Sequence, residues 1–387
     1  MPPRPALYLD HHATTPLDDR VLEAMLPYLT EDFGNAASRS HVFGWRAEAA
    51  VEQARESIAA ALGAEPREVV FTSGATEANN LALLGAGRQR GRSRGRKRMV
   101  ALATEHPAVL DPLAALGREG HDVEIVPVEP DGLVDLERLH AAVDDRTAVV
   151  SAMAANNEIG VLQPLAEIGA IAREAGAWFH SDAAQAAGRL ALRVDREPID
   201  LLSLSGHKLY GPKGVGALFV RARGPRVVLE PILYGGGHER GLRSGTLPVA
   251  LIVGLAKALA LALLERETEW ARLAGLRDRL WRRLSSELEG VRCNGSRAQR
   301  LPGNLNVSFE DVEIDKLLLA LPDLALSTGS ACSSATPEPS HVLLALGLTE
   351  PLARASLRFG LGRSTTAADL DFAADRVVEA VRTQRGR

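Results

Sequence analysis

Helix-forming and strand-forming segments alternate from about residue 44 to residue 265, and this alternation constrains the fold more than any other feature of the sequence. Apolar residues recur at helical spacing over 45–62, and the β-branched run EVVFT follows at 68–72. Further strands are predicted at 99–103, 123–126, 147–152, 177–181, 200–204 and 216–220, and helices at 76–84, 108–118 and 165–175. Strands that alternate with helices predict an α/β fold, in which a sheet is flanked by helices.

The pattern changes after residue 265. A charged amphipathic helix is predicted over 267–288, short strands near 304–309 and 357–360, and a last helix over 367–382. This second texture predicts a smaller α+β domain, and a chain of 387 residues is long enough for about two domains. We therefore expect a large domain at 17–263 and a small domain built from 1–16 and 264–387.

Charge and targeting signals narrow the functional classes. The formal net charge of -4 gives no general attraction to nucleic acid or to anionic membranes, and the N-terminus lacks the apolar core of a signal peptide, so a cytoplasmic protein is expected. The apolar stretch 247–264 contains Pro248 and Lys257, and we interpret it as a buried core helix rather than a membrane span. The basic run 87–98 has no interleaved aromatic residues, which favours a solvated surface loop over a nucleic-acid patch.

The sequence contains two cysteines, Cys293 and Cys332, so no disulfide framework is expected. Cys332 lies in LSTGSACSSATPEPS, where small and polar residues predict a loop, and it is a candidate reactive thiol. The alternative is the small buried hydrophobe that most lone cysteines are, and Cys293 is expected to be of that structural kind. No metal site is expected, because CxxC and HExxH are both absent.

Three segments carry candidate chemistry at strand ends. Lys208 follows the strand DLLSL in SGHKLYGPKGVG, where a lysine can reach a ligand at the carboxyl edge of a sheet; a turn lysine or a phosphate ligand is the alternative. The turn TSGAT at 72–76 can bind phosphate through backbone N–H groups, or can simply be a helix cap made by Ser or Thr. Asp182 ends an apolar strand, where it can hold a protonated ring nitrogen or cap the next helix.

Distinctive segments follow one another in a fixed order over nearly the whole chain. They include YLDHHATTP, FGNAASRSHVFGW, VFTSGATEANNLA, TEHPAVL, NNEIGVLQP, HSDAAQAAG, SLSGHKLYGPKGVGALFVR, GGGHERGLRSGTLPV, NLNVSF, STGSACSS and LRFGLGR. Each segment alone is weak evidence, but jointly they are highly specific. The chain resembles the cysteine desulfurases of the NifS/IscS type, within the class-V aminotransferase group of pyridoxal 5'-phosphate (PLP) enzymes.

The resemblance implies fold type I of the PLP enzymes, with a mostly parallel sheet in the large domain, and it implies a role for each matching residue. Lys208 matches the lysine that binds PLP covalently, and His106 the acid/base that stacks on its ring. Asp182 matches the partner of the ring nitrogen. Gln185 and Asn157 match contacts to the hydroxyl side of the ring. The matches to the phosphate contacts are Ala75, Thr76, Ser205, His207 and Thr246.

The same resemblance implies partners and a reaction. Thr246 matches a contact supplied by a second subunit, which implies a homodimer. Asn35 and Arg358 match the clamp on the substrate carboxylate. Cys332, in a mobile loop at about 327–340, matches the thiol that takes sulfur from L-cysteine and leaves alanine and a persulfide. The persulfide would serve acceptors such as an iron–sulfur scaffold or a tRNA thiolation protein.

Two departures and two rivals accompany the resemblance. Ala36 and Ala184 replace residues common in the family, and the sequence ends at Arg387, where many members have a longer tail that contacts an iron–sulfur scaffold. A selenocysteine lyase or another class-V aminotransferase is the nearest rival, and it would not need Cys332. A non-catalytic PLP-binding protein would require a broken site, whereas Lys208, His106, Asp182 and Arg358 are all present.

Overall fold

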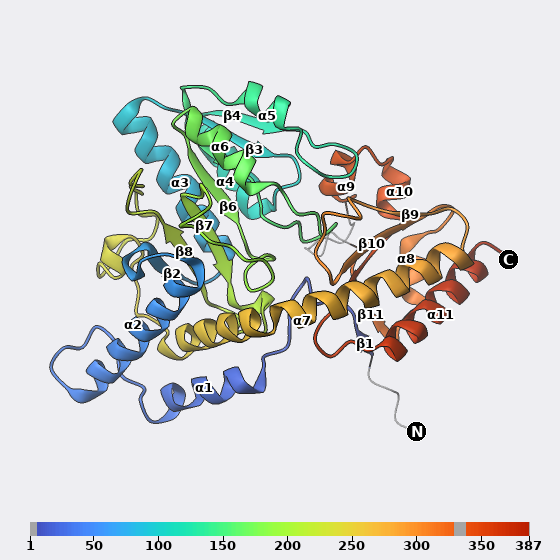
Figure 1. The fold of residues 1–387 in the computed structure, drawn as a ribbon, viewed down its shortest axis with the longest axis horizontal. Helices are drawn as coiled ribbons and strands as arrows, with labels where there is room; N and C mark the ends of the chain where they lie inside the picture. Colours follow the sequence, from blue (N-terminus) through green and yellow to red (C-terminus); the bar gives the residue numbers. More distant parts are fainter. Residues whose placement is uncertain (1–5, 329–337, 387) are drawn as a thin grey trace.

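The structure, a computed structural model, describes residues 6–328 and 338–386, and its main feature is a seven-stranded sheet (Figure 1). The strands are β2 (Val69–Thr72), β3 (Arg98–Leu102), β4 (Asp122–Val126), β5 (Thr147–Ser151), β6 (Trp178–Asp182), β7 (Leu201–Ser205) and β8 (Gly216–Val220). Their order is β2-β8-β7-β6-β5-β3-β4. The pairs from β4 to β7 are parallel, and β8 runs antiparallel to both of its neighbours. The predicted α/β sheet, mostly parallel, is confirmed.

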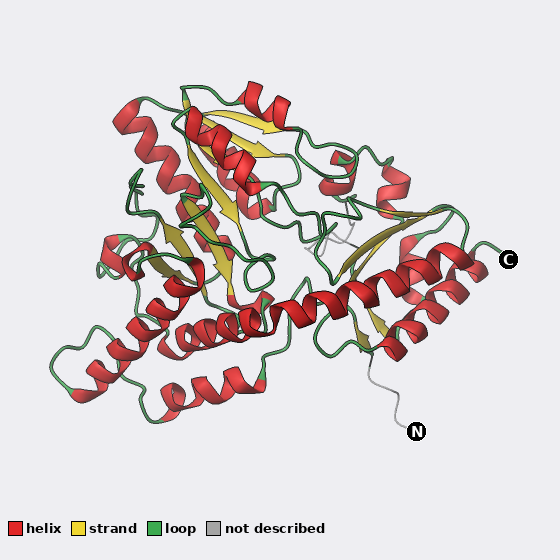
Figure 2. Cartoon of the chain, viewed as in Figure 1, coloured by secondary structure: helices red, strands yellow, loops and turns green. Residues whose placement is uncertain are grey.

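Helices cover both faces of this sheet (Figure 2). Alternate side chains of its strands enter two apolar cores, one on each face. Met99 packs with the core that contains α3 (Ala75–Arg94) and α4 (Pro107–Arg118). Val100, the next residue, packs with the core that contains α2 (Val42–Leu62) and α6 (Leu165–Glu174). Burial on both faces explains why the central strands are continuous apolar runs without a polar alternation. Two further helices of this region are α1 (Asp19–Thr30) and α5 (Leu136–Ala142).

A smaller region has its own sheet and its own core. Its antiparallel sheet has the order β12-β10-β9, and β1 pairs in parallel with β11. The strands are β1 (Leu7–Tyr8), β9 (Val291–Cys293), β10 (Asn304–Phe309), β11 (Leu324–Ala325) and β12 (Ser356–Gly360). Helices α8 (Ile314–Leu319) and α11 (Ala367–Gln384) pack in this core. Helices α9 (His341–Ala345) and α10 (Glu350–Arg354) lie between them in the chain, but their buried apolar residues pack in a core of the large region. The N-terminal strand β1 therefore pairs with the C-terminal part of the chain.

One helix of 39 residues, α7 (Val249–Glu287), runs through both regions (Figure 1). Its apolar first half packs in a core of the large region, whereas Leu280 and Leu284 pack in the core of the small region. The two helices predicted at 247–264 and 267–288 are thus one helix, because no glycine or proline interrupts the charged residues between them. The predicted boundary at 263/264 falls inside α7 and stays a prediction. No helix in the described ranges 6–328 and 338–386 is long and apolar enough to cross a membrane.

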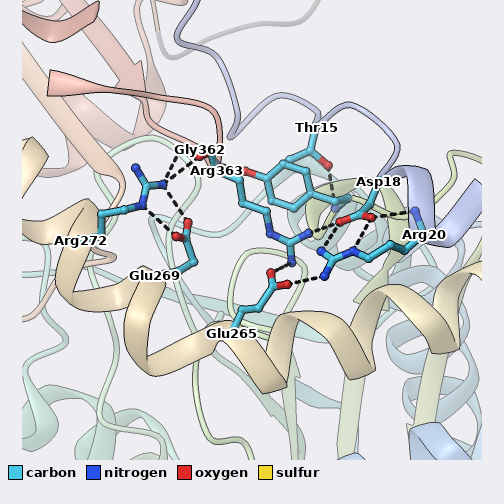
Figure 3. A network of polar contacts seen from close by, with 9 residues as sticks. Thr15, Asp18, Arg20, Glu265, Glu269, Arg272, Gly362 and Arg363 are labelled. Atoms are coloured by element: carbon cyan, nitrogen blue, oxygen red, sulfur yellow. Dashed lines mark hydrogen bonds and ion pairs between the residues drawn. The ribbon is translucent and has the colours of Figure 1, made fainter. Parts of the chain in front are cut away.

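A polar network joins the middle of α7 to the start of α1 and to the segment that follows β12 (Figure 3). Glu265 of α7 pairs with Arg20 at 2.7 Å and with Arg363 at 3.1 Å. Arg363 also pairs with Asp18 at 2.7 Å, and its guanidinium lies 4.3 Å from the ring centroid of Tyr210. The network therefore fixes the segment after β12 against the large region.

The prediction of a surface loop over 87–98 is wrong for most of that run. Helix α3 continues to Arg94 and ends at Gly95, which adopts the left-handed conformation (φ 67°) of a helix C-cap. Arginine and glutamine favour helix, and Gly87 lets the helix approach α4: a Cβ there would lie 2.8 Å from Leu116. Gly87 therefore serves close packing, and Gly95 ends the helix.

Candidate active site

Nine of the residues predicted for the site line a single cavity of about 490 Å³. The cavity lies at the carboxyl edge of the parallel strands, where a ligand is expected in an open α/β sheet. These lining residues are Ala75, Thr76, His106, Asn157, Asp182, Gln185, Ser205, His207 and Lys208. Residues from five separate segments of the chain are thereby brought together.

Lys208 occupies the short turn that follows β7. Its Nζ donates hydrogen bonds to the carbonyl oxygens of His12 and Ala13, both at 2.7 Å. Burial, followed by the nearby charges of Arg358 and Arg189, lowers the pKa of Lys208 to about 8. An amine with such a pKa is partly uncharged near neutral pH, which a nucleophilic lysine requires.

Asp182 is the last residue of β6, and its carboxylate is buried. Oδ2 accepts a hydrogen bond of 2.6 Å from Asn79 Nδ2, and Oδ1 accepts one of 2.8 Å from the backbone N–H of Ala184. The Ala184 contact resembles the capping alternative, but the carboxylate also lines the cavity. Asn79 is a functional residue that sequence reasoning missed, since an asparagine inside a helical pattern gives no signal of its own.

His106 is the N-cap of α4 and lines the cavity beside Asp182 and Lys208. Its Nδ1 accepts a hydrogen bond of 3.0 Å from the backbone N–H of Ala108, so the neutral ring carries its proton on Nε2. Burial, opposed by the charge of Asp182, lowers the pKa of His106. The ring is therefore neutral at pH 7.

Glu105, which precedes His106, is fully buried beneath the cavity. Oε1 accepts a hydrogen bond of 2.7 Å from Met153 N, and Oε2 has no partner in the part of the chain that the structure describes. Burial raises the pKa of Glu105 to about 8, so the carboxyl is largely neutral at pH 7. Its neutrality leaves Asp182 and Asp10 as the carboxylates that act on Lys208.

The start of α3 forms another part of the cavity wall. Its N-cap is Gly74, which provides no side-chain hydrogen bond, so the alternative of a cap made by Ser or Thr is wrong. The first N–H groups of the helix are left for another acceptor, and the helix dipole favours an anion there. Ser205, His207 and Lys213 line the same cavity. Burial and the two lysines lower the pKa of His207 to about 4, so it is neutral too.

Gln185 is held by the N-terminal segment. Its Oε1 lies 3.0 Å from His12 Nδ1, and its Nε2 donates to the carbonyl oxygen of His12 at 2.8 Å. His12 is buried at 2 % exposure, and burial lowers its pKa well below the usual value. The segment of residues 12–14 thus closes the cavity next to Gln185 and Lys208, a role that the adjacent histidines did not reveal in the sequence.

The predicted substrate clamp, which combines Arg358 of the small region with Asn35 of the large region, is only partly assembled. Arg358 lies in β12 at 2 % exposure, and its Nη2 pairs with Asp10 Oδ1 at 2.7 Å. Its Nη1 donates to the carbonyl oxygen of Asn157 at 3.1 Å, which brings it to the cavity wall. Asn35 is exposed on the loop after α1, and neither residue is among those that line the cavity.

Thr246 is exposed on the loop before α7 and does not line the cavity of its own chain. Its loop is nevertheless anchored near the phosphate end, because Arg243 Nε donates to Glu77 Oε1 at 2.7 Å. Glu77 in turn accepts a hydrogen bond of 2.7 Å from Ser73 N. Thr246 is therefore exposed on a loop that Arg243 anchors to α3.

Of the two cysteines, Cys293 lies among the described residues. Cys332 and most of the predicted loop lie outside the described residues. Cys293 in β9 is half-buried, and its Sγ accepts a hydrogen bond of 2.8 Å from Arg300 Nη1. In the described ranges, no group of three or more histidine, cysteine, aspartate and glutamate residues could hold a metal ion.

The donor set of the cavity fits PLP, the cofactor that the resemblance implies. The uncapped start of α3 suits a phosphate, and the buried carboxylate of Asp182 suits a protonated ring nitrogen. Asn79 Oδ1 is buried and has no hydrogen-bond partner among the described residues, and Lys208 lines the same cavity. The cavity wall thus offers complementary groups for a phosphate, a protonated ring nitrogen and an aldehyde.

The chain is similar to known proteins over nearly its whole length. The family model of the class-V aminotransferases matches residues 7–372. The cysteine desulfurase IscS of Anaeromyxobacter sp. (strain Fw109-5) is 56% identical over 379 residues, which cover 98% of this chain and 93% of that protein. The mouse cysteine desulfurase is 51% identical over 98% of this chain and 82% of its own. The solved structure of a NifS-like protein has a TM-score of 0.90 at 34% identity and covers 98% of this chain and 100% of that one.

Proposed function

The chain belongs to the cysteine desulfurases of the class-V aminotransferase family, and from this premise we propose that it uses PLP to take sulfur from L-cysteine onto Cys332, leaving alanine. The observation that carries the proposal is the convergence of Lys208, Asp182 and His106 on one cavity. These three supply a nucleophilic amine, an anionic partner for a ring nitrogen and a neutral acid/base. A binding protein without catalysis would not need all three.

The cofactor would lie between α3 and β6. The start of α3, with Ser205 and His207, would hold the phosphate, and Asp182 would hold the ring nitrogen. Gln185 and Asn157 would contact the hydroxyl side. PLP, when bound, withdraws electrons from the substrate α-carbon and makes the α-proton acidic.

Protons would be moved by Lys208 and His106. The lowered pKa of Lys208 lets its amine accept the α-proton near neutral pH. Because Nδ1 of His106 accepts a hydrogen bond from Ala108 N, the ring proton is on Nε2, and Nε2 can act as the proton donor in the cavity. Burial keeps both groups out of bulk water, which favours proton transfer between them and the substrate.

Arg358 and Asn35 would hold the carboxylate of L-cysteine. Asp10 fixes the guanidinium of Arg358 on one side, and its Nε is buried without a partner in the described part of the chain. Arginine binds a carboxylate through two parallel hydrogen bonds, so a fixed guanidinium sets the orientation of the substrate. The substrate carboxylate would replace Asp10 as a partner of the Arg358 guanidinium.

Cys332 would accept the sulfur. Its thiolate attacks the substrate sulfur, an S–S bond forms as the C–S bond breaks, and the substrate Cβ takes up a proton to give alanine. Described residues on both sides of this segment are tied to the site: Ser327 O accepts from Arg358 N at 2.7 Å, and His341 Nε2 lies 2.9 Å from Glu105 O. These ties support delivery of the thiol to the cavity.

A homodimer in the cytoplasm is part of the proposal. Thr246, exposed on a loop anchored to α3, would complete the phosphate site of a partner subunit. The persulfide would pass to a sulfur acceptor, such as an iron–sulfur scaffold or a tRNA thiolation protein. Sedimentation at assay concentration tests the dimer, and a fully active monomer would contradict it.

The decisive experiment measures alanine formed per PLP-loaded protein. We expect the Cys332→Ser variant to lose turnover with L-cysteine, because a serine hydroxyl is a poor sulfur acceptor. The Cys293→Ser variant is the matched control, and mass spectrometry should find the added sulfur on Cys332 of the wild type. Equal loss in both variants, or none at Cys332, would discard the persulfide mechanism and favour a selenocysteine lyase or an aminotransferase.

A further inference from the structure

A second cavity lies at the opposite edge of the large sheet from the active site. It has a volume of about 780 Å³ and is found where α3 ends and where β6 and β7 begin, away from α7 (Figure 1). The arginines that line it come from three elements: Arg90, Arg94 and Arg96 from the basic run at the end of α3, Arg173 from α6, and Arg226 from the segment after β8. The proposed reaction uses none of them.

The positive charge of this arginine cavity is not neutralised by its own wall. Asp200 is the acidic residue among those lining it, and its Oδ1 already lies 3.2 Å from Arg221 Nε. Asp200 Oδ2 accepts a hydrogen bond of 2.9 Å from Phe179 N. Within the described ranges, none of the five arginines forms an ion pair. The cavity therefore has a strong excess of positive charge.

Arg90 is built into the wall rather than free in solvent. It is 7% exposed, its guanidinium lies 4.5 Å from the ring centroid of Trp178, and its Nη2 donates to Gly176 O at 2.5 Å. Its Nε is buried and has no partner among the described residues. Burial, together with Arg96 and Arg94, lowers the pKa of Arg90 to about 10. A guanidinium held in this way is costly to bury until an anion compensates it.

We propose that the arginine cavity binds a small anion of the oligophosphate class. Guanidinium groups form paired hydrogen bonds with phosphate oxygens, and several of them here face one space. The volume is within the range of about 300–1,000 Å³ typical of small-molecule sites, so a single phosphate would fill little of it. A chain of phosphates, free or attached to a nucleoside, matches both the charge and the volume.

The test is calorimetric titration of the PLP-loaded enzyme with sodium tripolyphosphate at low salt, so that the phosphate contacts of the active site are already filled. We expect saturable binding of one anion per chain and a change in the fluorescence of Trp178. Arg173→Gln and Arg226→Gln alter exposed residues, which should leave the fold intact, and each should weaken binding about tenfold. A parallel titration with ATP separates the sources: tighter binding of ATP indicates a nucleotide, and equal binding indicates the free oligophosphate.

The matched control is Arg292→Gln, which removes the same charge from an exposed position in β9. It should leave the affinity unchanged. The proposal is overturned if tripolyphosphate does not bind, or if all three variants weaken binding equally, because that would reflect diffuse attraction. Binding of a poly-glutamate peptide without binding of tripolyphosphate would also overturn it.

Discussion

The two sides of the active site are built differently. On the cofactor side, Asp182, Ser205 and Lys208 stand at the ends of adjacent strands of one sheet, so hydrogen bonding within the sheet fixes their relative positions. On the substrate side, Arg358 comes from a second sheet and is held beside the cavity by Asp10 and by the carbonyl oxygen of Asn157. Cofactor binding and substrate binding should therefore respond separately to mutation.

The largest effect is expected on the cofactor side. Lys208→Ala removes both the covalent attachment and the base, and alanine formation should fall by about 1,000-fold or more. Lys257→Ala, at an exposed position of α7, is the control and should keep wild-type turnover. Borohydride reduction of the wild type should attach PLP to Lys208, and a label on Lys213 would refute the assignment.

Asp182→Ala is the next effect in size. The variant should retain PLP, because the phosphate end is untouched, but turnover should fall by about 100-fold, as is typical when one fixed electrostatic partner is lost. Asp145→Ala removes an exposed carboxylate and serves as the control. Near wild-type turnover in Asp182→Ala would mean that Asp182 only caps the following turn.

Arg358→Lys tests the substrate side. Lysine keeps the charge but cannot form the paired hydrogen bonds, so KM for L-cysteine should rise by about tenfold while PLP content stays at the wild-type level. If Arg358→Lys also lost PLP, substrate binding and cofactor binding would depend on each other, and the distinction between the two sides would be wrong. Arg292→Lys provides the control for an arginine outside the site.

The smallest effect links the two sides through charge. PLP uptake by the apoenzyme requires the neutral amine of Lys208, whose pKa is lowered to about 8 by burial first and by Arg358 second. The uptake rate should therefore rise about tenfold between pH 7 and pH 9 and then level off, whereas an ordinary lysine would still be rising. In Arg358→Gln the midpoint should move to higher pH. Stopped-flow absorbance measures both rates, and an unchanged midpoint would show that the sides do not interact.

The cofactor side was largely predictable from sequence because its residues follow short apolar strands. Lys208 and Asp182 stand where such a run stops, and parallel strands bring those ends to one edge. Asn79 and His12 were not predictable, since their contacts join segments that are distant in sequence. The clamp at Arg358 could be inferred from family resemblance alone, because its approach to the cavity depends on how two sheets are placed.

Two predictions about the fold, the loop at 87–98 and the division of α7, were wrong for physical reasons. The run 87–98 was assigned to a surface loop because it is basic, has low complexity and lies between a predicted helix and a predicted strand, but Gly87 gives α3 room to pack against Leu116. Similarly, α7 was divided where its composition changes at Glu265, although charged residues do not end a helix. In the first case tertiary packing decided the outcome, and in the second a change of composition was taken for the end of a helix.

The continuity of α7 has a consequence for folding. Because Leu259 belongs to one apolar core and Leu284 to another, the same helix completes both. A fragment that ended within α7 would leave apolar side chains of each core in water, so neither half is expected to be a stable independent unit. Thermal unfolding should therefore proceed as one cooperative transition, and loss of the small sheet would take the cofactor cavity with it.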